Sequence, residues 1–404
     1  FKKENRYFSK QEYFSKIPGS QIAYWVSEKF LSIFSENKIS DFATVTNGLF
    51  TCDNKLFLRL WHEVINKNIY FNCASRLNSE SDTRSWYPYN KGGDYRRWYG
   101  NHDHIVNFRG FGKGVSKFRF NRGQSKSFPG QDFYFIESVS WSFVSSSNFG
   151  VRYYPSGFVF DISGSSLFVN EPQKRLFILG FLSCKISIMI LRMINPTINF
   201  QAGDVKSIPI NEEMFNNSYI EDLVIVNVNQ AKRNWDSFEV SWNFEKHPLL
   251  RYTNDPDNST KNQLSNSYNS WKEFTNKQFF QLQDNEEELN RIFIDIYGLQ
   301  DELTPEVEEK DITIHRIFDE KQDVPSTMKG SKYILLKEDV MKSFISYGIG
   351  CLFGRYSLDV DGLAYAGGDW DDTKYQTIIP DDDNIIPISE EAYLEDDLLG
   401  RFIS

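Results

Sequence analysis

The sequence predicts an α+β protein: a mixed, β-rich domain that contains one buried helix, then a helical spacer, then an acidic region of helix and loops. Short apolar runs separated by Gly, Asn and Ser fill much of the first half of the chain. One long apolar segment interrupts them at residues 176–194, and apolar residues recur at helical spacing after Ile210. With 404 residues and a hydrophobic content of 40%, the chain is long enough to bury more than one core.

The residue pattern of the N-terminal part of the chain predicts one short amphipathic helix, followed by a series of strands. Apolar residues recur at helical spacing over residues 20–34, directly after Pro18-Gly19, and Ser20 is a suitable N-cap. From Ile39 the pattern changes to short β-like runs bounded by turn residues. We expect strands at residues 42–45, 57–60, 69–72, 132–135, 141–144 and 158–162.

The long apolar segment, residues 176–194, is the expected buried helix. Its length is close to that of a membrane span, but Lys185 lies at its middle and Arg192 near its end. A charge at the centre of a bilayer costs about 2.5–3.5 kcal/mol on insertion scales, so we favour a core helix instead. Pro196 should end this helix, because proline has no backbone N–H to continue it.

The chain after Ile210 predicts helices at residues 219–234, 268–285, 286–299 and 337–353. Leu289, Phe293 and Tyr297 belong to an apolar stripe that indicates a helix packed on a partner surface. Residues 251–266 are rich in Asn, Asp, Ser and Thr and predict a linker. We divide the chain into an N-terminal helical linker (1–39), the β-rich domain (40–215), a helical spacer (216–303) and an acidic helical and loop region (304–404).

Residues 84–126 concentrate basic and aromatic side chains in a protein whose formal net charge is −10. This stretch holds ten basic and two acidic residues, with ten aromatic rings between them. Lys and Arg neutralise phosphates and aromatic rings stack on bases, so the composition predicts contact with a nucleic acid. The alternative is a solvated face of a β-domain. Gly92-Gly93 and Gly100 flank Arg96 and Arg97, so we expect these two arginines on a loop.

Charge is unevenly distributed along the chain. Residues 284–404 carry 11 basic and 29 acidic side chains, so the preceding residues are basic overall. The acidic total therefore does not exclude a nucleic-acid partner. The four cysteines lack the close spacing typical of a zinc site, and we expect them to be reduced thiols of a cytoplasmic protein.

The sequence offers no convincing catalytic or metal site. His102-Asp103-His104 lacks a further close metal ligand, and we favour a surface turn there. The Asp381-Asp382-Asp383 run lacks the Gly and the final Glu of an EF-hand loop. Pieces of a nuclease carboxylate-lysine motif near Asp257 and Asp319 do not lie on adjacent predicted strands, and no phosphate loop occurs. These features indicate a binding module for a polyanion.

Several longer phrases resemble one family. They include Ile17-Pro18-Gly19-Ser20, Trp86-Tyr87-Pro88-Tyr89-Asn90-Lys91-Gly92-Gly93, Trp141-Ser142-Phe143, Phe149-Gly150-Val151-Arg152-Tyr153, Glu287-Glu288-Leu289-Asn290-Arg291-Ile292-Phe293 and Tyr365-Ala366-Gly367-Gly368-Asp369-Trp370. Through these phrases the chain resembles, over nearly its whole length, the adenine-specific DNA methyltransferases of BREX phage-defence systems, the PglX family.

The resemblance implies a part of the enzyme that follows its catalytic domain. In the family that domain carries the loop that binds S-adenosylmethionine and an Asn/Asp-Pro-Pro-Tyr/Phe motif that holds the flipped adenine. This sequence has no Pro-Pro pair, and Asn195-Pro196-Thr197-Ile198 is its nearest imitation. We therefore assign no catalytic residue and no cofactor to the chain, which we expect to be a fragment. The full-length parent is expected to use S-adenosylmethionine.

The resemblance also implies a DNA target-recognition domain over residues 40–215, similar in outline to those of type I specificity subunits and TaqI-like methyltransferases. An entry phrase at residues 45–51 and a closing phrase at residues 199–210 bracket the basic stretch. The residues expected to contact DNA are Asn47, Thr51, Lys91, Arg96, Arg97, Arg109, Lys113, Lys117, Arg119, Arg122, Arg152 and Gln201.

The expected partners are double-stranded DNA, the catalytic domain of the same parent chain and other BREX proteins, and no membrane is expected. Arg and Asn side chains would read base edges, while Lys, Ser and backbone amides would hold phosphates. The alternative function is a protein-interaction scaffold, in which the acidic C-terminal region and the aromatic-rich surface dock other defence components. A nuclease is the third and weakest interpretation, because no carboxylate cluster supports it.

Overall fold

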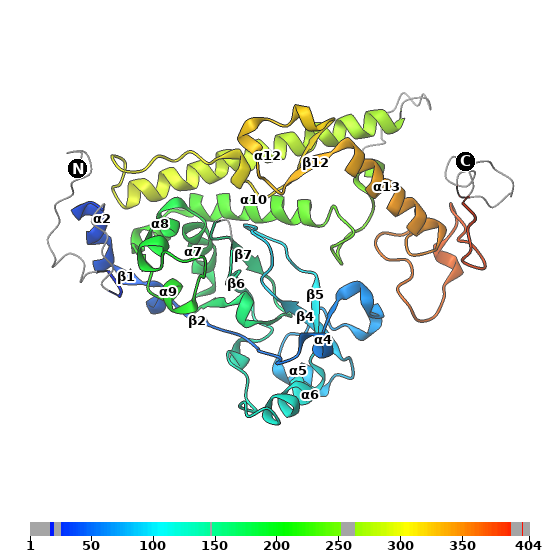
Figure 1. Ribbon diagram of the computed structural model, residues 1–404, viewed down its shortest axis with the longest axis horizontal. Coiled ribbons are helices and arrows are strands. Elements are labelled where there is room, and N and C mark those ends of the chain that lie inside the picture. Colours follow the sequence, from blue (N-terminus) through cyan, green and yellow to red (C-terminus); the bar gives the residue numbers. More distant parts are fainter. Residues whose placement is uncertain (1–16, 20–25, 146–147, 252–262, 389–397, 399–404) are drawn as a thin grey trace.

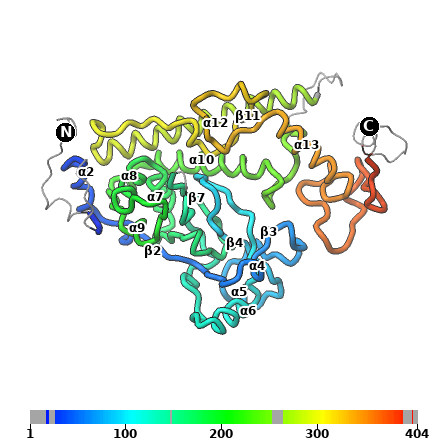
Figure 2. The backbone as a smooth tube through the Cα atoms, viewed as in Figure 1, coloured from blue at the N-terminus to red at the C-terminus, as the bar shows by residue number. Residues whose placement is uncertain are grey.

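The computed structural model describes residues 17–19, 26–145, 148–251, 263–388 and 398. Among these residues the helices are α2 (Glu28–Ser32), α3 (Ile39–Phe42), α4 (Asn54–Phe57), α5 (Arg76–Ser81), α6 (Arg109–Phe120), α7 (Arg175–Leu182), α8 (Lys185–Ile194), α9 (Ala202–Lys206), α10 (Ser218–Trp235), α11 (Pro248–Arg251), α12 (Gln263–Ile296) and α13 (Lys337–Leu352). The long helices α10 and α12 run along one side of the molecule, and α5 and α6 lie at the opposite edge (Figure 1). Helix α13 follows α12 in the chain and lies toward the end of the molecule where the C-terminus is (Figure 2).

Two four-stranded sheets lie between these helical tiers (Figure 1). The antiparallel sheet has the order β2 (Ala43–Thr46), β9 (Ser166–Val169), β6 (Ser138–Trp141) and β7 (Val151–Tyr154). The mixed sheet has the order β3 (Leu58–Leu60), β5 (His104–Asn107), β4 (Trp86–Asn90) and β8 (Val159–Phe160), with β4 and β8 parallel. Helices and sheets share one chain without strict alternation, so the predicted α+β class is confirmed.

The described residues also form two separate two-stranded sheets. β1 (Asn37–Lys38) pairs antiparallel with β10 (Pro209–Ile210), which brings together the beginning and the end of the predicted recognition domain. The Ile39 amide also donates a hydrogen bond to the Ile208 carbonyl at 2.9 Å. β11 (Arg316–Phe318) pairs parallel with β12 (Ile334–Leu336) beside α13.

The predicted strands agree with the structure only in part. Residues 57–60 and 158–162 contain the whole of β3 and of β8, residues 42–45 contain most of β2, and residues 141–144 share only Trp141 with β6. Residues 132–135 are wrong as a strand, because Gln131–Phe133 forms a 3-10 turn, and residues 69–72 contribute one bridge at Ile69. Of the helix predicted over residues 20–34, the described part contains α2, which begins at Glu28 with Ser27 as N-cap. Ser20 itself lies outside the described residues.

The predicted buried helix is two helices, α7 and α8, which meet at an angle of 76°. Cys184 between them has an extended backbone, and the Asn290 side chain accepts a hydrogen bond from the Lys185 amide at 2.9 Å. The break lets Lys185 turn outward, where its ammonium donates to the Thr304 carbonyl at 2.9 Å. No single described helix is long and apolar enough to cross a membrane, although this bent pair passes on length and composition together.

The main core joins the antiparallel sheet to α7, α8, α10 and α12. The apolar stripe of α12 packs on α7, because the Phe181 ring lies 5.5 Å from Phe293 and stacks on Tyr297 at 5.6 Å. The stripe is thus confirmed as a packing surface, although the two predicted helices around it form one. A second core lies under the mixed sheet and contains Phe108, Phe111 and Val115 at the start of α6.

Candidate nucleic-acid interface

Arg97 and Glu286 form a buried ion pair between the basic stretch and α12. The guanidinium Nη2 lies 2.8 Å from Glu286 Oε2, and only 4% of Arg97 and 3% of Glu286 are exposed. The indole of Trp98 donates to the same carboxylate at 2.7 Å. Burial raises the pKa of Glu286, and the Arg97 charge opposes that shift. Sequence reasoning missed Glu286, although its position three residues before Leu289 puts it on the apolar face of the helix.

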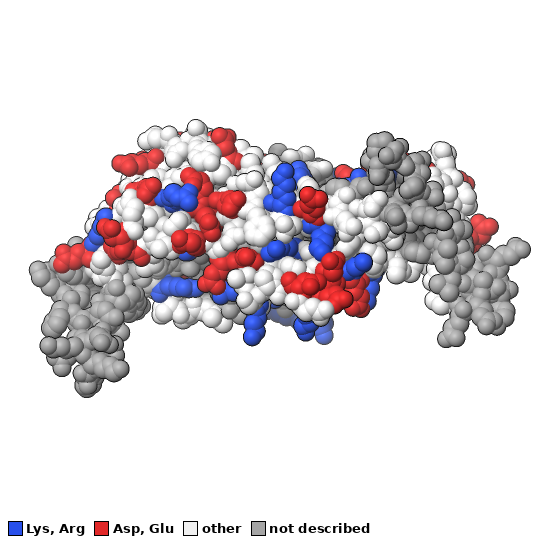
Figure 3. Space-filling model, turned by 90° about the horizontal axis from the view of Figure 1, so that it is seen from above, with Lys and Arg blue, Asp and Glu red and all other residues white. Residues whose placement is uncertain are grey.

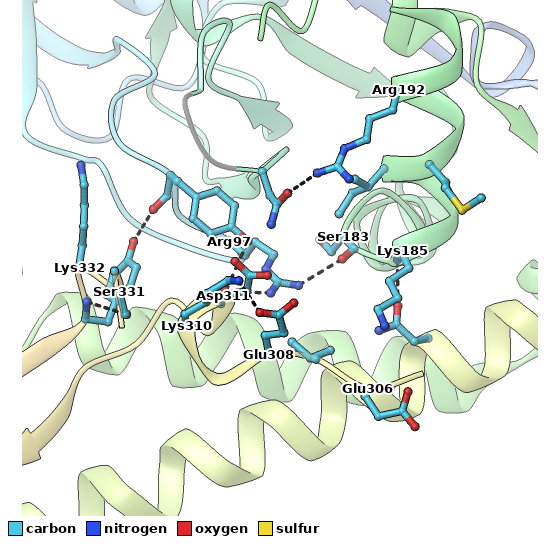
Figure 4. A pocket seen from close by; sticks show the side chains of 18 of the residues that line it. Arg97, Ser183, Lys185, Arg192, Glu306, Glu308, Lys310, Asp311, Ser331 and Lys332 are labelled. Atoms are coloured by element: carbon cyan, nitrogen blue, oxygen red, sulfur yellow. Dashed lines mark hydrogen bonds and ion pairs between the residues drawn. The ribbon is translucent and has the colours of Figure 1, made fainter. Parts of the chain in front are cut away.

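Further bonds hold the Arg97 side chain beside a cavity of about 640 Å³ (Figure 4). Its guanidinium donates to the Ser183 carbonyl at 3.4 Å and to the Asp311 carbonyl at 2.9 Å. Lys185 and Arg192 reach the cavity from α8, with Lys185 close to Glu306, while Glu308 and Asp311 also line it (Figure 4). The cavity therefore has charges of both signs on its walls, and Arg97 is neutralised from within the protein.

Arg96 and Arg152 are also interior side chains. The Arg96 guanidinium lies between the Trp235 ring, 4.9 Å away, and the Tyr333 ring, 5.0 Å away. Arg152 is fully buried and donates to the Arg96 carbonyl at 3.1 Å and to the Ser142 hydroxyl at 3.0 Å. Residues 91–97 have no regular secondary structure, so the prediction of a loop is confirmed. Its arginines face α10, α12 and residues 311–333.

Five of the twelve residues predicted to contact DNA are therefore corrected to structural roles, because their side chains are buried: Thr51, Arg96, Arg97, Arg119 and Arg152. Thr51 donates to the Asn54 side chain at 2.8 Å, and Arg119 lies 5.3 Å from the Phe128 ring centre. Lys91 is half-buried and pairs with Asp161 at 2.7 Å. Changing Arg96 and Arg97 to Glu would place carboxylates in the interior and test folding rather than DNA contact.

Five exposed basic residues gather at and after α6: Arg109, Lys113, Lys117, Arg122 and Lys126. We call this group the α6 basic surface. Within the described residues no ion pair with a carboxylate engages any of them, while the guanidinium of Arg122 lies 3.7 Å from the Phe118 ring centre and Lys126 lies 4.5 Å from that of Phe120. The surface is thus a cluster of unneutralised cations with an exposed aromatic ring, since Phe120 is 53% exposed.

A left-handed turn sets the direction of α6. Gly110, Phe111 and Gly112 have φ values of 60°, 57° and 73°, and right-handed helix follows from Lys113. A left-handed residue other than Gly costs about 1–2 kcal/mol, so Phe111 needs support from its surroundings. Phe111 is buried, and the Arg76 guanidinium lies 4.4 Å from its ring centre. In the right-handed part Lys113 and Lys117 are four residues apart and share one face.

Asn47 and Gln201, from the entry and closing phrases, are both exposed. The Asn47 side chain accepts a hydrogen bond from the Ser165 hydroxyl at 2.8 Å. Gln201 is the N-cap of α9. Its backbone amide donates a hydrogen bond to the carboxylate of Asp204 in the first turn of that helix, at 3.3 Å. α9 packs beside β2, so the two phrases lie on neighbouring elements. Both residues are exposed, although the Asn47 amide oxygen is already engaged by Ser165.

His102-Asp103-His104 is not the surface turn that we favoured. His102 is 1% exposed and packs against Tyr99 and Tyr154, with ring centres 4.5 and 4.6 Å away. Burial and the nearby Arg152 charge hold its pKa well below the usual range. Only His104 pairs with Asp103, at 2.7 Å. Within the described residues, no group of three or more His, Cys, Asp or Glu is placed to hold a metal.

The opposite side of the molecule has a different charge pattern. The face above α12 and the residues that follow it carries several clusters of acidic side chains, with basic ones between them (Figure 3). Helix α6, which carries the α6 basic surface, lies at the far edge of the molecule (Figure 1). A polyanion would therefore meet mostly repulsion on the α12 face and attraction at α6.

Comparison with known proteins gives a consistent result. No family model matches the chain. It is 39% identical over 403 residues to the adenine-specific methyltransferase PglX of Lacticaseibacillus casei (strain Zhang), covering 98% of this chain and 31% of that protein. It is 34% identical over 404 residues to the adenine-specific methyltransferase BrxX of Escherichia coli O9:H4 (strain HS), covering 97% of this chain and again 31% of the relative. The chain is thus homologous to the adenine-specific methyltransferases PglX and BrxX and spans about a third of their length.

Proposed function

We propose that this chain is the DNA target-recognition region of an adenine-specific DNA methyltransferase of BREX phage defence. The relationship to PglX and BrxX supports the reaction class. The α6 basic surface carries the proposal of DNA contact, because its five cations have no carboxylate partner among the described residues. Phosphate contacts supply affinity and register, and base contacts supply specificity.

Asn47 and Gln201 are the proposed base readers, since exposed amides pair bidentately with adenine edges. The catalytic domain of the parent is the proposed partner that binds S-adenosylmethionine and transfers the methyl group, in the cytoplasm. Asn195, in the nearest imitation of the adenine-binding motif, does not fit that role: its side-chain amide donates to the Asn199 carbonyl and the Asp204 carboxylate at 3.1 and 2.7 Å. It is therefore occupied within its own turn.

The second candidate function is a protein-interaction scaffold. The acidic clusters on the α12 face favour it, because they offer a surface complementary to a basic protein partner (Figure 3). A scaffold of this kind has no need for the α6 basic surface. Binding of duplex DNA therefore separates the two candidates.

Fluorescence anisotropy with a labelled duplex tests the proposal. We expect binding whose affinity falls steeply with salt, because each neutralised phosphate releases counterions. If all five cations of the α6 basic surface contact phosphates, the slope of log K against log salt is about −4.5. Absence of binding at low salt would contradict the proposal and leave the scaffold.

A further inference from the structure

Arg96 is a buried cation that forms no ion pair with a carboxylate in the part of the chain that the structure describes. Its exposed fraction is 9%, and its Nε and Nη1 atoms are buried without a hydrogen-bond partner. The rings of Trp235 and Tyr333 lie on the guanidinium but offer no carboxylate. Burial lowers the pKa of Arg96 from its usual range, and the nearby Arg152 charge acts in the same direction.

The neighbouring Arg152 adds a second such charge. It is fully buried, and all its acceptors are neutral: the carbonyls of Gly92 and Arg96 and the hydroxyl of Ser142. Arg97, by contrast, has Glu286 at 2.8 Å. A buried charge is costly unless it is paired and hydrogen-bonded. The loop, with Arg96, and β7, with Arg152, thus place two positive charges without a described acidic partner beside each other.

Arg96 lines a pocket of about 440 Å³. Lys91 and Lys332 reach the same pocket from two different parts of the chain. The acidic side chains at the pocket, Asp94 and Asp103, are already paired with Lys332 at 3.0 Å and His104 at 2.7 Å. Lys332 and Lys91 are themselves paired, with Asp94 at 3.0 Å and Asp161 at 2.7 Å, so Arg96 is the lining cation that no described carboxylate pairs with.

We propose that this pocket binds a phosphate group. A phosphate oxygen would accept a charge-assisted hydrogen bond from the Arg96 guanidinium and supply the negative charge that Arg96 lacks, next to the buried charge of Arg152. Lys332 is 64% exposed at the rim and would exchange part of its contact with Asp94 for the bound group. The phosphate comes either from a free phosphate or nucleotide or from the DNA backbone. This site is separate from the α6 basic surface, and only its assignment to a backbone phosphate rests on the proposed function.

Isothermal titration with inorganic phosphate, with adenosine monophosphate and with a DNA duplex tests the site on the whole chain. We expect one phosphate to bind. Lys332→Gln should weaken it about fivefold, and Arg96→Gln at least about tenfold, as expected for charge-assisted hydrogen bonds. Lys329→Gln is the control, because Lys329 is exposed nearby but does not line this pocket. Lys332→Gln keeps the test valid if Arg96→Gln fails to fold.

The titrations with the three ligands show whether the bound phosphate is a free phosphate or nucleotide or belongs to the DNA backbone. Binding of inorganic phosphate or the nucleotide that Lys332→Gln weakens assigns a free phosphate. The source is a backbone phosphate if neither small ligand binds and Lys332→Gln lowers the duplex affinity while Lys329→Gln does not. No phosphate binding and equal duplex affinity in both variants would overturn the site. The double variant Lys113→Glu/Lys117→Glu should leave phosphate binding unchanged, so failure of the DNA proposal is read separately.

Discussion

Replacing Arg97 by alanine is expected to destabilise the protein by about 3–5 kcal/mol, because it leaves the Glu286 carboxylate buried and unpaired. The effect should be large since this pair ties the loop of the basic stretch to α12. Urea unfolding followed by circular dichroism measures it as a lower midpoint with an unchanged slope. The double variant Arg97→Ala/Glu286→Ala should lose less than the sum of the single variants, because neither charge then remains alone.

Lys342→Ala is the matched control for Arg97→Ala. Lys342 also pairs with a carboxylate, Glu338, but both side chains are exposed on α13. Exposed pairs contribute little, so the unfolding midpoint should not move. A loss below about 1 kcal/mol for Arg97→Ala would show that the buried pair does not hold the loop to α12.

The second large effect is expected on DNA binding. Lys113→Glu/Lys117→Glu should weaken duplex binding about a hundredfold near physiological salt, since it removes two phosphate contacts and adds repulsion. The slope of log K against log salt should become flatter by about two. Both residues are exposed, so the unfolding midpoint should stay nearly unchanged. Anisotropy titrations at several salt concentrations measure both quantities.

The control for this variant carries the same change of charge on the other side of the molecule. Lys277 and Lys329 are exposed, on α12 and in the segment before β12. Lys277→Glu/Lys329→Glu should lower duplex affinity only slightly, through the net charge. Equal losses in the two double variants would mean that the α6 basic surface has no special role in binding.

Local patterns predicted part of the fold. α10 and α13 follow from their periodicity and differ from the prediction by at most one residue at each end. The break between α7 and α8 was missed because it depends on a tertiary contact, the hydrogen bond from the Lys185 amide to Asn290. β4 was missed as well, since Pro88 weakens a strand pattern and the strand is stabilised by neighbours far along the chain.

Composition located the basic stretch but could not say which of its cations reach solvent. Arg97 is neutralised by Glu286, which lies 189 positions later in the chain. Arg96 forms no ion pair among the described residues, and the rings of Trp235 and Tyr333 cover it instead. Such partners follow from the arrangement of helices and not from local sequence. The exposure of Lys113 and Lys117 was easier to predict from the sequence, because residues four apart on a helix share one face. This face lies opposite the buried Val115 and Arg119.

Hydrogen–deuterium exchange with and without saturating duplex DNA tests the central claim most directly. The claim is that the chain contacts DNA through the α6 basic surface. We predict slower amide exchange over residues 109–126 in the presence of duplex and unchanged exchange over residues 263–285 of α12. Unchanged exchange over residues 109–126, with slower exchange along α12 or over residues 304–336, would contradict it.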